Sequence, residues 1–424
     1  MTERLLQYIW QMQFFNKNAL CTSAGESLTI QYPGWFNTNQ GPDFLQAKIK
    51  IGSTSWVGNI ELHIHTSDWK NHHHEEDANY SNVMLHVVWE HDLKNDDESS
   101  RNIPLLILQD RVSKFLLTRY EELMYNHTII ACEKNAHTVP AFIWDAWKTR
   151  LAAERLERKS KIIQGYLQQT NNHWEEVFWW ILAKNFGATV NADAFEAMAK
   201  SIQVNILAKH KNQIHQIEAL LLGQAGLLNA DFTETYPVML KKEFRFLREK
   251  YKLKTIHEPV HFLRMRPGNF PTIRLAQLAM LIHHSSHLFA QIKDITALNE
   301  VKELFTVTAN DYWHYHYRLD EPSTFRPKIM GESTIQNIII NTAVPAVFAY
   351  GVVNNEQRYK VKALQWLESL APEENRVTRQ WEQLGVLNIS ALDSQALTEL
   401  TKEYCLHKHC LQCATGAAIL KGCL

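Results

Sequence analysis

Hydrophobic and polar residues alternate with a period of two in the first part of the chain, which is the pattern of half-buried β-strands. In one such run the apolar side chains of Leu45, Ala47, Ile49 and Ile51 share one face, and Gly52 then predicts a hairpin turn. The pattern predicts a helix at residues 2–15 and strands at residues 26–32, 44–51, 56–65, 83–91 and 103–109.

From about residue 111 the apolar positions recur every three to four residues, which is the period of amphipathic helices. Helices are expected at residues 111–125, 142–168, 173–186, 191–208, 212–223, 237–252, 272–291, 332–353, 355–370, 375–385 and 394–410. The sequence therefore predicts an α+β protein. A mixed-sheet module (1–130) precedes a mostly α-helical domain (131–424) that ends in a cluster of cysteines.

Length and composition place the chain among globular proteins with more than one hydrophobic core. The chain has 424 residues, which is long for a single core, and its 45% hydrophobic content is too high for a disordered protein. No run of eighteen apolar residues occurs, so no membrane span is expected. Only 6 cysteines occur, 4 of them in the last twenty residues, which favours a reducing and hence cytoplasmic location.

The net charge of −1 conceals a difference between the two parts of the chain. Residues 1–110 carry 7 Lys and Arg against 14 Asp and Glu, whereas the remaining residues carry 37 against 31. An acidic module can hold cations, and a basic body can hold an anionic partner such as nucleic acid. Excesses of this size are also compatible with ordinary solvated surfaces.

Basic and aromatic residues in the helical part indicate where nucleic acid would bind. Thr272 is expected to cap the helix that follows a Pro/Gly-rich segment, and helix N-termini attract phosphate. The candidate basic and stacking residues are Arg264, Arg266, Arg274, Arg326, Lys328, Tyr312, Trp313, Tyr315 and Tyr317. The alternative is that these arginines hold loops in place by donating to backbone carbonyls.

The densest candidate chemistry lies between Asp43 and His91. Asp43 opens one predicted strand, while Glu61 and His63 share one face of its hairpin partner. Carboxylates that converge from adjacent strands form a site for Mg²⁺ or Mn²⁺, because these ions prefer oxygen ligands. His63 would point into the same site as a ligand or as a base. We therefore predict a metal site at Asp43 and Glu61, with Asp43, Glu61 and His63 as catalytic residues.

At these residues the chain resembles the PD-(D/E)XK nuclease superfamily, which has an α-β-β-β-α-β core. The superfamily signature is an acidic residue on the second strand followed by Glu-x-Lys on the third. The resemblance assigns these roles to Asp43 and to Glu61-Leu62-His63, with Glu3 as an additional helical carboxylate. It implies a metal-dependent phosphodiesterase that acts on nucleic acid, although His63 replaces the superfamily lysine. The whole chain also resembles an uncharacterised bacterial family of unknown function.

Other functions remain open for this segment. A chain that lost the superfamily lysine is also compatible with a non-catalytic nucleic-acid-binding or scaffold protein. A zinc hydrolase is a third possibility, for which the weaker candidates are His65, Asp68, His74, Asp77 and His86. The consecutive residues His72, His73 and His74 cannot all face one ligand, and most of them are expected to be exposed. Protein partners cannot be inferred from the sequence.

The C-terminal cysteines Cys405, Cys410, Cys413 and Cys423 have the spacing C-x4-C-x2-C-x9-C. Four thiolates at such spacing suit zinc or an iron–sulfur cluster. Some PD-(D/E)XK nucleases carry an iron–sulfur cluster with one outlying cysteine, and this resemblance would give that role to Cys21 or Cys132. The alternative is packing, because cysteine is commonly a small buried residue and residues 413–420 resemble a terminal helix.

Overall fold

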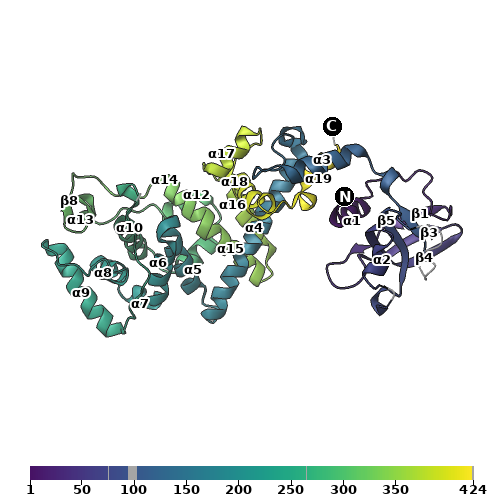
Figure 1. Ribbon diagram of the computed structural model, residues 1–424. Coiled ribbons are helices and arrows are strands. Elements are labelled where there is room, and N and C mark those ends of the chain that lie inside the picture. Colours follow the sequence, from purple (N-terminus) through teal and green to yellow (C-terminus); the bar gives the residue numbers. More distant parts are fainter. Residues whose placement is uncertain (75, 94–102, 264, 423–424) are drawn as a thin grey trace. The chain divides into compact units, whose positions relative to one another are not determined.

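The computed structural model describes residues 1–74, 76–93, 103–263 and 265–422. It divides into two compact units (Figure 1). The first unit comprises Met1–Trp147, Gln383–Val386 and Leu400–Leu424, and the second comprises Lys148–Glu382 and Leu387–Glu399. The first division along the chain follows Trp147, and the cysteine-rich C-terminal segment is grouped with the sheet.

The first unit contains a curled mixed sheet with the strand order β1-β3-β4-β5-β6. The β1/β3 and β3/β4 pairs are antiparallel, whereas the β4/β5 and β5/β6 pairs are parallel. A short strand, β2, pairs with β3. The strand bounds are β1 Leu28–Tyr32, β2 Trp35–Phe36, β3 Phe44–Ile51, β4 Thr54–His65, β5 Val83–Glu90 and β6 Leu105–Ile107.

Helices and short turns connect and cover this sheet. Helix α1 (Glu3–Met12) begins at Thr2, whose hydroxyl accepts the Leu5 N–H, and it packs against β4. Because β4 and β5 are parallel, a crossover must join them, and it consists of α2 and a short 3₁₀ turn. The remaining helical elements of this unit are α2 Asp68–Asn71, η1 Ala78–Tyr80, η2 Gln109–Arg111, α3 Lys114–Tyr125, η3 Ala136–Thr138, η6 Leu400–Cys405, η7 Cys410–Gln412 and α19 Ala414–Lys421.

A β-bulge at the start of β3 changes which side chains face the core. The register shifts between Phe44 and Ala47, and Gln46 takes a positive φ of 56°. The extra residue turns Phe44, and not Leu45, to the buried side. The predicted face is therefore correct for Ala47, Ile49 and Ile51 and wrong for Leu45.

The second unit is almost entirely helical. Its helices are α4 Ala141–Gln169, α5 Trp174–Phe186, α6 Ala188–Ser201, α7 Val204–Lys209, α8 Ile214–Gln224, α9 Thr235–Tyr251, α10 Pro271–His284, α11 Leu288–Asp294, α12 Leu298–Leu304, α13 Asp311–His314, α14 Glu332–Ile338, α15 Val344–Val353, α16 Gln357–Ser369, α17 Arg376–Gln383 and α18 Ala391–Glu399. The division between the units falls inside α4. A 3₁₀ turn, η4 (Pro267–Asn269), a π-helical turn, η5 (Ile339–Ala343), and a small hairpin, β7 (His316–Arg318) with β8 (Glu321–Pro322), complete the unit.

One helical run of the second unit is long and apolar enough to cross a membrane. It extends over Glu332–Val353, and 72% of its most apolar window is buried inside the protein. Burial of this extent is typical of a core helix. The apolar residues of this run therefore pack in the core of the helical unit.

The structure confirms the predicted fold class, since a mixed sheet is followed by a mostly helical body. Two expected helices are each divided in two, because residues 191–208 and 272–291 contain turns at Ile202 and Ser285. Thr272 does not cap α10 as expected. Its buried hydroxyl instead donates to the carbonyl of Tyr317 at 2.5 Å.

Candidate metal centre

Asp43 and Glu61 lie next to each other where β3 begins and β4 passes beside it. The Asp43 N–H donates to Glu61 Oε2 at 3.0 Å, and the Leu62 N–H donates to Asp43 Oδ2 at 3.0 Å. Each acidic side chain therefore accepts a backbone N–H from the opposite strand. The predicted pair of carboxylates is brought together by the antiparallel pairing of the two strands.

Helix α1 adds two polar side chains to this pair. Gln7 Nε2 donates to Asp43 Oδ1 at 2.8 Å, which fixes the orientation of that carboxyl group. Glu3 lies close enough for its charge to raise the pKa of both Asp43 and Glu61. Three acidic residues from α1, β3 and β4 thus share one region, as the resemblance implied for Glu3.

Glu61 is buried and Asp43 is half-buried, and neither has a lysine or arginine beside it among the described residues. Burial raises the pKa of Glu61, and the charge of Asp43 raises it further; burial likewise raises the pKa of Asp43. Within the described ranges, neither carboxylate forms an ion pair with a lysine or arginine. Elsewhere in the protein, buried Asp393 pairs with Lys148 at 2.9 Å. The raised pKa values favour the protonated carboxyl groups in the absence of a cation, and a bound divalent ion would instead favour their ionised forms.

His63 lies on the same face of β4 as Glu61, as the parity of their positions predicted. Its Nε2 is 3.5 Å from Glu61 Oε1, and its Nδ1 shares a hydrogen bond with His86 Nε2 at 2.9 Å. Burial lowers the pKa of His63 to about 2, with further contributions from His86, His74 and His72. A ring with this pKa is neutral at physiological pH and a weak base, so it suits ligation or positioning better than proton abstraction.

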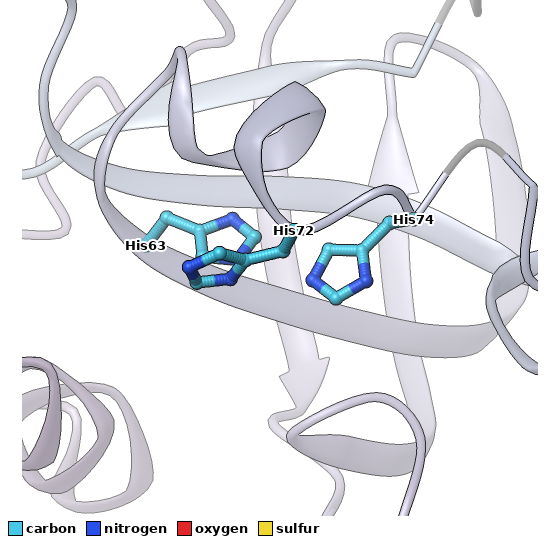
Figure 2. Close-up of side chains that lie close together, drawn as sticks. All are labelled: His63, His72 and His74. Atoms are coloured by element: carbon cyan, nitrogen blue, oxygen red, sulfur yellow. The ribbon is translucent and has the colours of Figure 1, made fainter.

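Two further histidines reach His63 from the segment after α2 (Figure 2). The ring of His74 stacks on that of His63 with centroids 5.2 Å apart, and His72 meets the same ring edge-on at 5.0 Å. The chain reverses at His73, whose φ is 56°, so that residue is not part of the group. Most of the three consecutive histidines are exposed, as expected, since only His74 is buried; the turn at His73 nevertheless places both His72 and His74 beside His63.

The group is completed by aromatic side chains that the sequence analysis did not select. Tyr80 stacks on His74 with ring centroids 3.8 Å apart, and Trp69 contacts both His63 and His86. These rings, together with the histidines, bury the polar face of β4 that carries Glu61 and His63. Glu61 and His63 are 5% and 1% exposed, respectively, so this face is part of the interior.

Four cysteines are buried in the first unit. Cys132, Cys405, Cys410 and Cys413 influence one another electrostatically, and burial raises the pKa of each thiol. Cys21 lies apart from this group and accepts a hydrogen bond from Arg111 at 3.8 Å. Cys423 lies outside the described residues. The tail forms α19, which gives the packing alternative a structural basis.

The candidate nucleic-acid residues of the helical unit are largely engaged in internal contacts. Arg274 donates to Asn269, Gln277 and Thr334. Buried Lys328 donates to the carbonyls of His314 and Arg326. Arg264 lies outside the described residues. The expected alternative, in which basic side chains hold loops in place, describes Arg274 and Lys328 well.

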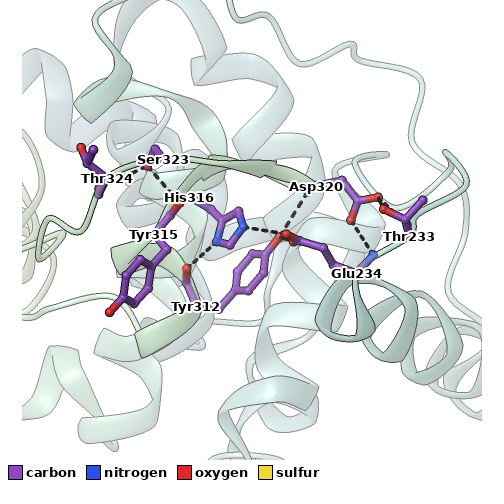
Figure 3. A network of polar contacts seen from close by, with 8 residues as sticks. All are labelled: Thr233, Glu234, Tyr312, Tyr315, His316, Asp320, Ser323 and Thr324. Atoms are coloured by element: carbon purple, nitrogen blue, oxygen red, sulfur yellow. Dashed lines mark hydrogen bonds and ion pairs between the residues drawn. The ribbon is translucent and has the colours of Figure 1, made fainter.

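The aromatic run at residues 312–317 also has internal partners (Figure 3). Tyr312 donates to Glu234 Oε2 at 2.8 Å and stacks on His316, whose Nε2 is 3.1 Å from Glu234 Oε1. Trp313 is fully buried and donates to Glu218. Tyr315 is 52% exposed, and its ring contacts that of Phe325 with centroids 5.2 Å apart.

Comparisons with known proteins give one match. No curated protein and no solved structure matches the chain. The sequence model of a family described as "Protein of unknown function (DUF2851)" matches residues 3–376. This match covers most of the chain and agrees with the resemblance to an uncharacterised family. The chain therefore belongs to the DUF2851 family.

Proposed function

We propose that this protein is a metal-dependent phosphodiesterase that acts on nucleic acid, with Asp43 and Glu61 as ligands of Mg²⁺ or Mn²⁺. The observation that carries the proposal is the pair of carboxyl groups, buried Glu61 and half-buried Asp43, which has no lysine or arginine partner in the described part of the chain. Such a pair is costly unless a cation binds to it, and oxygen ligands favour hard divalent ions. The donor set therefore fits the proposed ion.

The arrangement of the elements supports the same proposal. Helix α1, the antiparallel strands β1, β3 and β4, and the parallel strand β5 follow one another in the order of the PD-(D/E)XK core. Asp43 and Glu61 occupy the positions that carry acidic residues in that superfamily. The crossover between β4 and β5 contains only a four-residue helix, α2, which is short for this core.

Each side chain of the site has a distinct role in this proposal. A bound divalent ion would offset the charge that develops on a phosphoryl group and lower the pKa of bound water. Gln7 holds Asp43 in position through its hydrogen bond. Neutral His63 is a positioning residue next to Glu61, since its low pKa makes it a poor base. The positive charge of the helical part would attract the phosphate backbone without selecting a sequence.

The central test is substitution of Glu61 by glutamine. We expect Mg²⁺ or Mn²⁺ to switch on cleavage of DNA or RNA by the wild type. Glu61→Gln should lower the rate by orders of magnitude, because an amide brings no charge to the ion. Its amide oxygen can still accept the Asp43 N–H, so the fold should persist. Glu76→Gln, which changes an exposed glutamate of the same unit, is the matched control and should keep full activity.

A non-catalytic nucleic-acid-binding or scaffold role is the second candidate function. It is favoured by one observation, the replacement of the superfamily lysine by the buried, uncharged His63. His63→Lys tests this point directly. If the folded wild type cleaves neither single- nor double-stranded DNA or RNA while His63→Lys does, His63 marks a site without catalytic activity. If neither protein cleaves, the phosphodiesterase proposal is wrong.

We also propose that the C-terminal cysteines bind zinc or an iron–sulfur cluster that stabilises the first unit. The candidate ligands are the buried thiols Cys132, Cys405, Cys410 and Cys413, which would have to move closer to hold an ion, because among the described residues only His63, His72 and His74 have three donor atoms within 4.8 Å of one another. Elemental analysis of anaerobically purified protein should find zinc or iron, and Cys410→Ser should lose it. Cys21→Ser should keep it, because Cys21 lies apart from the group. A metal-free wild type with full stability would leave only the packing role.

A further inference from the structure

We infer that His63, His72 and His74 form a second metal site, specific for a transition metal such as zinc. One ring nitrogen from each residue lies within 4.8 Å of the other two. The three residues come from two elements, since His63 is on β4 and the other two follow α2 (Figure 2). The inference does not depend on the proposed phosphodiesterase activity, although the two sites would share the neighbourhood of Glu61.

The nitrogens of two of these histidines are buried without a hydrogen-bond partner. His63 Nε2 and His74 Nε2 have none among the residues that the structure describes, and both residues are less than 9% exposed. Both nitrogens lie 3.5 Å from the same atom, Glu61 Oε1. A buried polar atom that lacks a partner costs free energy, and such atoms are rare in folded proteins. Two of them that face one carboxylate oxygen indicate that a ligand belongs between them.

The hydrogen bond between His63 and His86 prepares His63 for ligation. When His63 Nδ1 donates to His86 Nε2, the lone pair of His63 remains on Nε2, which is the nitrogen that faces Glu61. Outer partners of this kind fix the tautomer and the ring orientation of histidine ligands. Trp69 contacts both rings and holds them in place from the side.

The donor set selects the class of metal. Neutral imidazoles favour zinc and its neighbours, whereas Mg²⁺ and Ca²⁺ prefer oxygen ligands. Three histidines with one open position are a known arrangement for zinc. In a tetrahedral complex the ligand nitrogens stand about 3.4 Å apart, given zinc–nitrogen bonds of about 2.0–2.1 Å. His72 is exposed, so its side chain can move inward to this distance and gives the ion a path from solvent.

Glu61 Oε1 would supply negative charge next to the metal ion. A zinc ion between the three imidazoles would face this oxygen, because two of the ligand nitrogens already do. The other oxygen of the same group, Oε2, is engaged with the Asp43 N–H. One oxygen of the Glu61 carboxyl group thus faces the three histidines, while the other is held by the backbone of Asp43. The arrangement extends the site from a pair of acids to a mixed centre of oxygen and nitrogen ligands.

The test is titration of metal-free protein with Co²⁺, a spectroscopic substitute for zinc, followed by displacement with Zn²⁺. We expect each wild-type molecule to bind about one Co²⁺ ion at the histidine site. The bound ion should show the d–d absorption of four-coordinate cobalt. His72→Ala should weaken this binding at least roughly tenfold, as loss of a ligand requires. Because His72 is exposed, this variant should remain folded, which circular dichroism can verify.

His73→Asn is the matched control. It lies between the two ligands, is exposed, and has a positive φ that asparagine tolerates well, so it should bind cobalt as the wild type does. Ions held by the cysteines would be retained in both variants and would show thiolate charge-transfer bands. The inference would be overturned if His72→Ala bound cobalt as tightly as the wild type does. It would also be overturned if the wild type showed no absorption from histidine-bound cobalt. Cobalt binding without Mg²⁺-dependent cleavage would overturn only the proposed function.

Discussion

Glu218 is a carboxyl group with no solvent exposure at the centre of the helical unit. Its oxygens accept hydrogen bonds from Tyr236, Asn310 and Trp313, which are all neutral donors. Burial raises its pKa to about 7, and the three hydrogen bonds only partly oppose this effect. Near neutral pH this residue is therefore close to its point of ionisation in the folded protein.

This pKa makes a specific prediction about stability and pH. Since the folded-state pKa lies above the ordinary value of 4.5, the stabilisation is complete below pH 4.5 and is lost as the pH rises through about 7. The difference amounts to roughly 3 kcal/mol between the two limits. Glu218→Gln cannot ionise, so the free energy of unfolding of the wild type minus that of the variant should fall between pH 4.5 and pH 8. A constant difference in denaturant titrations would contradict the assignment.

Single residues also determine how closely helices approach each other. A Cβ atom at Gly223 on α8 would lie 2.2 to 2.5 Å from ring atoms of Phe244 on α9. Gly165, near the C-terminal end of α4, has no atom within 4 Å of the same position. Packing against Phe244 therefore requires glycine at position 223. At position 165 nothing requires glycine, which there only lowers the stability of the helix.

At the scale of these elements we predict opposite effects of the same substitution. Gly223→Ala should destabilise the protein by about 1–3 kcal/mol, because the methyl group overlaps the Phe244 ring. Gly165→Ala should stabilise it by about 0.5–1 kcal/mol, through the higher helix propensity of alanine. Thermal unfolding of both variants checks the sign. Phe244→Leu combined with Gly223→Ala should recover part of the loss, and no recovery would mean that the overlap is not the cause.

The elements themselves were largely predictable from the sequence, because the apolar period reports directly on which face is buried. The errors fall where one residue changes the direction of the chain. The bulge at Gln46 exchanged Leu45 for Phe44, and the turn at His73 placed His72 and His74 beside His63. The spacing of apolar residues carries no information about a single residue with positive φ. The bulge at Gln46 and the turn at His73 could therefore not be predicted from it.

For the molecule as a whole, the sequence indicated the two parts but not which part contains the C-terminus. Residues 400–424 are separated from the sheet by the entire helical unit along the chain, yet they belong to the first unit. Helix α19 packs on α3, where Arg119 donates to the Ile419 carbonyl at 3.4 Å, and Lys408 donates to the Asn126 carbonyl. Contacts between such distant segments leave no periodic signal.

The same division of the chain predicts the effect of truncation. A chain that ends at Glu399 retains every element of the helical unit but lacks part of the other unit. Calorimetry and limited proteolysis should therefore show selective loss of the sheet-containing unit, while the helical unit keeps its transition. A chain that ends at Gly422 is the control. Equal destabilisation of both units, or of neither, would show that the division does not correspond to independent folding.

The paired acids of the candidate metal centre were predictable for a related reason, since strand parity and a hairpin turn are local signals. The reciprocal hydrogen bonds between Asp43 and Glu61 were not, and they have a consequence for how this chain can diverge. Beyond the bulge, these two side chains add hydrogen bonds between the start of β3 and β4 to the backbone pairing of Phe44 with Ile60. Relatives that have lost all chemistry would still be under selection to keep both acids for their hydrogen bonds. Retention of the acidic pair in a related sequence is then a sign of the fold, and divergence at His72 and His74 is the better guide to a change in chemistry.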